Sequence, residues 1–170
     1  IGAITAGQHL ALYDMSPGQR LVFALSLAET KNVIHVLPNE RAAQRAMEDA
    51  AGLGARNCVL LQPREIRFIR AVASRDNDWQ RILALSKIIS GEAQVVILSA
   101  EALAQRLVPR AWFQGQSLRI SPGDSLKPGA LALRLTQMGY ERVSLVEGRG
   151  QFALRGDILD IYPPAMDTPA

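Results

Sequence analysis

The sequence is poor in the residue types on which several classes of protein depend. Among its 170 residues it has one cysteine, Cys58, and two histidines, His9 and His35. A single thiol cannot form an internal disulfide, and these three side chains do not make a zinc-ligand cluster. No apolar run approaches the ~20 positions of a membrane-spanning helix, and no basic segment precedes an apolar one at the start. We therefore expect a soluble, cytoplasmic chain with no metal site and no membrane contact.

The overall composition is that of an ordinary globular protein. It is 48% hydrophobic and 21% charged, and its formal net charge is +3. This modest positive charge permits contact with nucleic acid but falls short of a dedicated basic binder. Ile1 stands where a complete chain has Met, and residues 166–170 form a polar end. We therefore expect one domain and a fragment, cut from a longer protein.

The first part of the chain alternates short apolar runs with helical patterns. The runs predict buried strands at 32–37, 58–61 and 94–98, and the patterns predict helices at 19–29, 40–51, 76–90 and from Ser99 to about 107. Asn39 and Ser99 are expected N-caps, and Gly52 and Gly91 are expected at helix ends. Strand and helix in alternation predict an α/β fold with a parallel sheet.

The pattern changes after Pro109. We expect a short strand at 117–121, a helix at 127–138, and two extended runs at 141–147 and 151–162. The three residues 148–150 between those runs, Gly-Arg-Gly, predict a hairpin loop, and Gly156 predicts a bulge or a close backbone approach. The predicted domains are therefore an α/β domain at 1–115 and the first part of a smaller α+β domain at 116–170.

A nucleotide site would be expected just before the first helix, where the sequence departs from a phosphate-binding loop. Such a loop needs a lysine for the phosphates and a hydroxyl for magnesium. After Gly18 these two positions hold Gln19 and Arg20, and Pro17 replaces a flexible loop residue. We interpret the segment as a loop and a helix cap, with no ATP site.

Other polar residues do not form a catalytic set. Asp157, Asp160 and Glu147 are interleaved with arginines and have no nucleophile or base beside them, so we expect solvated ion pairs. His35 is expected in the core and Cys58 as a buried, inert thiol. Arg64, Arg67 and Arg70 recur at a spacing of three, which predicts either a basic stripe able to contact a phosphate backbone or a solvated helix face.

The end of the chain carries a long and specific pattern. Residues 139–143 read GYERV, and residues 146–163 read VEGRGQFALRGDILDIYP. This pattern resembles a stretch shared by the bacterial transcription–repair coupling factors (Mfd) and the excision-repair helicase subunit UvrB. The similarity continues upstream through 86–91 and 100–103. The degenerate loop at Gly18, Gln19 and Arg20 favours the coupling factors, because UvrB carries an intact loop there.

The resemblance implies a fold, a function and a set of partners. The fold would be a degenerate P-loop helicase-like domain with an inserted, smaller α+β domain that is incomplete here. The function would be non-catalytic recruitment of UvrA, within a DNA translocase that displaces stalled RNA polymerase. RNA polymerase, DNA, ATP and Mg would bind other parts of that protein, so no cofactor is expected here. The alternatives are a fragment of a UvrB-type helicase subunit that hydrolyses ATP, and a basic DNA-binding module.

The resemblance also implies one contact residue. Arg155 occupies the arginine of the family's Arg-Gly pair, which belongs to the UvrA contact. UvrB-type sequences commonly have a second arginine two positions earlier, where this chain has Ala153, so the contact is expected to be weaker or differently arranged. Arg149 is a further candidate for the same surface.

Overall fold

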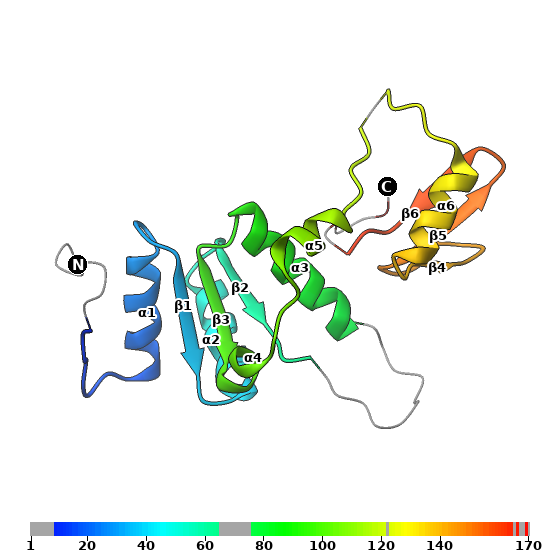
Figure 1. The fold of residues 1–170 in the computed structure, drawn as a ribbon. Coiled ribbons are helices and arrows are strands. Elements are labelled where there is room, and N and C mark those ends of the chain that lie inside the picture. Colours follow the sequence, from blue (N-terminus) through cyan, green and yellow to red (C-terminus); the bar gives the residue numbers. More distant parts are fainter. Residues whose placement is uncertain (1–8, 65–75, 122, 165, 167–168, 170) are drawn as a thin grey trace. The chain divides into compact units, whose positions relative to one another are not determined.

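The computed structural model describes residues 9–64, 76–121, 123–164, 166 and 169 (Figure 1). The chain divides into two compact units. One comprises Ile1–Val72 and Ala84–Arg106, and the other comprises Ala73–Leu83 and Leu107–Ala170. These units are groups of residues in contact, whereas a domain folds independently. The domain bounds 1–115 and 116–170 therefore stay a prediction.

The first unit is built on a parallel sheet. Its strands are β1 (Val33–Leu37), β2 (Cys58–Leu61) and β3 (Val95–Ser99), in the order β1-β3-β2. Val95 of β3 pairs with Val33 on one side and with Cys58 on the other. The predicted α/β class and parallel sheet are confirmed.

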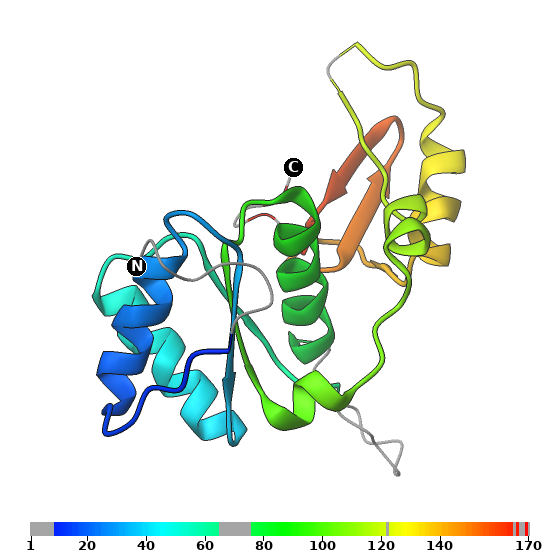
Figure 2. The same ribbon diagram turned by 60° about the vertical axis from the view of Figure 1, so that its left-hand side comes forward.

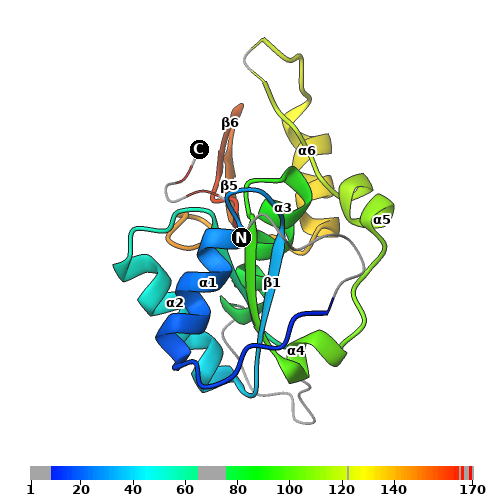
Figure 3. The ribbon, with the colours of Figure 1, turned by 90° about the vertical axis from the view of Figure 1, so that its left-hand side faces the viewer.

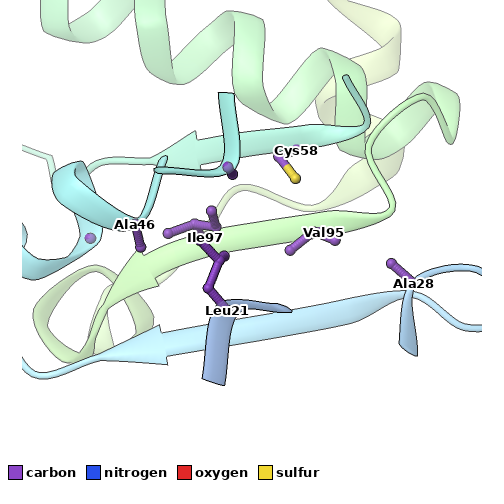
Figure 4. Close-up of a cluster of buried hydrophobic side chains, with 8 residues drawn as sticks. Leu21, Ala28, Ala46, Cys58, Val95 and Ile97 are labelled. Carbon is purple, nitrogen blue, oxygen red and sulfur yellow. The ribbon is translucent and has the colours of Figure 1, made fainter. Parts of the chain in front are cut away.

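Two helices cover one face of this sheet, α1 (Pro17–Leu27) and α2 (Glu40–Gly52) (Figure 3). The alanines of α2 recur at helical spacing, which lets the helix lie close to the strands. Figure 4 shows the resulting cluster of buried side chains between helices and sheet. Its members are Leu21, Ala28, Ala43, Ala46, Ala50, Cys58, Val95 and Ile97.

The opposite face carries α3 (Asp76–Ser90) and α4 (Ala100–Ala104). A second cluster forms there from Val59, Leu61, Ala84, Ala93, Leu98 and Ala102. Only the later half of α3 belongs to this unit, because the division between the units falls between Leu83 and Ala84.

The predicted helix caps formed, with one shift. The Asn39 Oδ1 accepts a hydrogen bond from the Ala42 N–H at 2.9 Å, and the Ser99 Oγ accepts one from the Ala102 N–H at 3.1 Å. Gly91 follows α3 with φ of +83°, as expected of a glycine beyond a helix end. Gly52 is instead the last residue of α2, and Gly54 takes the positive φ of +78°. The helix after Ser99 ends at Ala104, short of the predicted 107.

Strand β1 is less buried than predicted. Ile34 is 63% exposed and Val36 is 42% exposed, whereas Val33, His35 and Leu37 are half-buried. The apolar run predicted a strand covered on both faces. β1 is an edge strand of the described sheet, and every second side chain lies at the surface.

The second unit packs α6 (Pro128–Gln137) on a small mixed sheet of β4 (Glu141–Arg142), β5 (Gln151–Arg155) and β6 (Ile158–Ile161). The cluster between helix and sheet consists of Leu131, Ala132, Leu135 and Phe152. The strand predicted at 117–121 did not form, and Leu118 packs against this cluster from a loop instead. A short helix that was not predicted, α5 (Arg110–Gly115), precedes that loop.

The predicted hairpin loop at 148–150 is wrong. β4 pairs with β5 in parallel, and the antiparallel hairpin joins β5 to β6 (Figure 2). Its turn consists of Gly156 and Asp157, between the paired residues Arg155 and Ile158. Gly156 has a φ of +61°, which suits the first position of a two-residue hairpin turn and not the predicted bulge. A Cβ at Gly156 would meet nothing within 4 Å, so the alternative of a close backbone approach is also wrong. The segments 148–150 and 156–157 both contain glycine and both permit a turn. The pairing of apolar residues between β5 and β6 favours the turn at 156–157.

Candidate functional site

The hairpin β5–β6 has one buried face and one face that is open only at the turn end. Phe152 and Leu154 of β5 lie opposite Ile161 and Leu159 of β6, and all four belong to or pack against the cluster beneath α6. Because side chains alternate along a strand, the residues between them lie on the other face. On that face Ala153 is buried, with 1% of its surface exposed, so the face is open only at its turn end. The turn end carries Arg155, Ile158 and Asp160, and we call these three residues the open face.

Arg155 is the exposed cation of the open face. Its Nη2 donates to the Asp160 Oδ2 at 2.5 Å, and the two side chains are 60% and 36% exposed. An exposed pair of this kind contributes only about 0–1 kcal/mol to stability. Its effect is to orient the guanidinium across the hairpin. A guanidinium has five N–H donors, so the bond to Asp160 leaves others for an external carboxylate.

Arg149 does not lie beside Arg155. It is half-buried just before β5, and its Nε donates to the Met166 carbonyl oxygen at 3.3 Å. The five residues of β5, each rising about 3.3 Å, separate it from the turn end of the hairpin. The two predicted contact residues therefore stand at opposite ends of one strand.

The start of β5 is held by backbone and side-chain hydrogen bonds. The Gly150 N–H donates to the Tyr162 carbonyl at 2.7 Å, and the Gly150 carbonyl accepts from the Glu141 N–H at 2.8 Å. The Gln151 Oε1 accepts from the N–H groups of Glu147 and Gly148 at 3.0 and 2.9 Å. These bonds fix the loop that brings the chain from β4 into the centre of the sheet.

The acidic residues of this region do not converge. Asp160 pairs with Arg155, Asp157 lies exposed in the turn, and Glu147 lies exposed in the loop at the other end of β5. The predicted ion pairing is confirmed for Arg155 with Asp160. Within the described parts of the chain, no group of three or more His, Cys, Asp or Glu could hold a metal ion. Likewise, none of the helices described is long and apolar enough to cross a membrane.

The segment from Ser16 to Arg20, where the sequence departs from a phosphate-binding loop, forms a helix N-cap with a capping box. The Ser16 Oγ accepts from the Gln19 N–H at 3.3 Å, and the Gln19 Oε1 accepts from the Ser16 N–H at 2.8 Å. Arg20 donates from its Nε to the Met15 carbonyl at 3.0 Å. Pro17 and Gly18 lie in the first turn of α1 between them. The predicted cap is confirmed, and the Ser-x-x-Gln spacing of a capping box could have located it.

His35 and Cys58 differ in how far they are buried. His35 is half-buried on β1, not in the core as predicted, and burial together with the charge of Arg20 lowers its pKa. Cys58 is buried, as predicted, and burial raises the pKa of its thiol. A raised thiol pKa agrees with an inert role.

The predicted basic stripe is described at one residue only. Arg64 is exposed after β2, and its backbone is held by the Gln105 side chain through bonds of 2.6 and 3.2 Å. Arg67 and Arg70 lie outside the described residues, so the stripe stays a prediction.

Sequence reasoning missed Ile158 on the open face. This residue is 65% exposed and lies directly opposite Arg155. It sits in an apolar run, which indicates a core residue. Leu159 and Ile161 alternate with Ile158 along the strand and face the helix. This alternation could have indicated that Ile158 lies on the opposite face.

Comparison with known proteins identifies relatives for both parts of the chain. Residues 118–170 match the family described as the UvrB interaction domain. The transcription-repair-coupling factor of Bacillus subtilis is 33% identical over 162 residues, which are 93% of this chain and 14% of that protein. The protein of that name from Haemophilus influenzae is 26% identical over 95% of this chain and 14% of its own length. The one from Myxococcus xanthus is 38% identical over 74 residues, 44% of this chain and 6% of that protein.

These matches agree with the resemblance drawn from residues 139–163, and the region matched by the interaction-domain family contains the whole hairpin. The chain spans only a small part of the curated relatives. It belongs to the family of transcription-repair-coupling factors.

Proposed function

We propose that this chain is the UvrB-like module of a transcription-repair coupling factor and recruits UvrA through the open face of hairpin β5–β6. The observation that carries the proposal is Arg155, which is exposed on that hairpin inside the region matched by the UvrB interaction domain. The module acts by presenting this surface to an acidic patch, and no bond is made or broken. A planar guanidinium suits the task because it binds a carboxylate through two parallel hydrogen bonds.

The rest of the activity belongs to parts of the protein outside this chain. The full-length protein would be an ATP-dependent DNA translocase that displaces stalled RNA polymerase, with ATP and Mg bound in its motor. The first unit would be a helicase-like domain that has lost its phosphate loop, and the second would belong to a domain inserted into it. Support comes from the parallel sheet of the first unit and from the capping box at Ser16 and Gln19.

The affinity of the 170-residue chain for UvrA tests the proposal. Arg155→Ala should weaken binding by about 1–3 kcal/mol, because it removes a charge-assisted hydrogen bond. Arg134→Ala is the matched control, since Arg134 is an exposed arginine of the same unit on α6, beneath the other face of the sheet. Thermal unfolding should be unchanged in both variants. Wild-type affinity in Arg155→Ala would remove the basis of the assignment.

A further inference from the structure

The open face of the hairpin combines a cation with an exposed aliphatic side chain. Ile158 is the cross-strand partner of Arg155, in the last pair before the turn. Side chains in such a pair lie about 5 Å apart on the same face. Ile158 is 65% exposed and does not belong to the cluster beneath α6.

A single exposed apolar residue is common and by itself indicates nothing. Ile158 differs in its neighbour, because it is the cross-strand partner of Arg155, and the Arg155 guanidinium bonds to Asp160 two residues further along β6. Contacts that dominate binding between proteins usually join a charged or aromatic anchor to apolar surface that excludes water around it. A charge–carboxylate bond shielded in this way gains strength, because less water competes for it.

We propose that Ile158 is part of the UvrA contact and supplies the apolar surface that seals the bond between Arg155 and the partner's carboxylate. The inference rests on the proposed function and adds to it the chemistry of the partner. The acidic group on UvrA must be bordered by aliphatic or aromatic side chains, not surrounded by water. An acidic patch without such a border would bind Arg155 but gain nothing from Ile158.

The chain offers a matched control for this residue. Leu133 is 62% exposed and lies on α6, whose buried residues Leu131 and Leu135 face the sheet from the other side. Leu133 and Ile158 therefore have similar exposure in the same unit but lie on opposite sides of the sheet. Ile158→Thr keeps the β-branched shape that suits a strand, so it serves as a second variant should Ile158→Ala disturb the hairpin.

The experiment measures the affinity for UvrA of the chain with Ile158→Ala, Ile158→Thr, Leu133→Ala and Arg155→Ala. We expect the two Ile158 variants to bind about tenfold more weakly. We expect Leu133→Ala to bind as wild type. In the double variant Arg155→Ala/Ile158→Ala, the loss should be smaller than the product of the two single losses, because each side chain acts through the other. Raising the salt concentration should weaken Ile158→Thr by a larger factor than wild type, because an unshielded charge pair is screened more strongly, and should weaken Arg155→Ala by less than either.

The outcomes separate the two proposals. If Arg155→Ala loses affinity while Ile158→Thr and Leu133→Ala both bind as wild type, Arg155 acts through charge alone. The inference about Ile158 is then overturned, and the proposed function stands. If Arg155→Ala also binds as wild type, the proposed function fails with it. Equal losses for Leu133→Ala and Ile158→Thr would show an effect that is not local to the hairpin and would likewise overturn the inference.

Discussion

At the scale of single residues, the ionisation of His35 links the stability of the fold to pH just below neutrality. Burial and the Arg20 guanidinium lower its pKa from the ordinary value of 6.5. A lowered pKa means that the folded chain takes up this proton at a lower pH than the unfolded chain does. Above pH 6.5 His35 is mostly neutral in both states and costs nothing. As the pH falls below 6.5, the unfolded chain is protonated first and the folded state loses stability.

We therefore expect His35→Gln to make the free energy of unfolding less sensitive to acid below pH 6.5. Glutamine is polar but does not titrate in this range. Urea unfolding of wild type and variant at a series of pH values would check this. Arg20→Gln should raise the pKa of His35 in an NMR titration, because it removes the second cause of the shift. Parallel pH curves for wild type and His35→Gln would contradict the prediction.

At the scale of elements, the entry into β5 depends on a glycine that no other residue replaces easily. Gly150 is buried with a φ of +77°, and a Cβ there would lie 2.1 Å from the Trp79 Cζ2 of the same unit. Gly150→Ala should therefore combine backbone strain with steric overlap and destabilise the chain by about 2 kcal/mol or more. Thermal or denaturant unfolding measures the change.

Gly156→Ala separates the two contributions to that cost. Gly156 has a φ of +61°, and a Cβ there would meet nothing within 4 Å. We expect this variant to lose only the conformational part, about 1–2 kcal/mol. In Trp79→Ala/Gly150→Ala the steric part should disappear, so the double variant should cost less than the sum of its single changes. Equal losses in Gly150→Ala and Gly156→Ala would show that Trp79 does not restrict Gly150.

The same elements show which parts of the fold the sequence predicts. The caps at Asn39 and Ser99 and the strand at 58–61 depend on neighbouring residues, and they were predicted close to where they lie. The hairpin was misplaced because both Gly-containing segments permit a turn, and the choice depends on pairing between distant residues. The exposure of Ile34 and Ile158 was missed for a similar reason. An apolar run does not say which of its faces another element covers.

At the scale of the whole molecule, the degenerate loop predicts that this chain does not bind ATP. Ser16 and Gln19 occupy each other's hydrogen-bonding groups at the start of α1, and Arg20 is bound to the Met15 carbonyl. The lysine that binds phosphate and the hydroxyl that binds magnesium in a working phosphate loop are both missing at these positions. Isothermal titration of the 170-residue chain with ATP should give no magnesium-dependent heat. Gln19→Lys should not restore binding, because Pro17 still stands where a flexible loop residue is needed, but it should cost about 0.5–1 kcal/mol of stability by opening the cap. Magnesium-dependent binding by wild type would overturn the interpretation of Gln19 and Arg20 and would make the first unit a working nucleotide site.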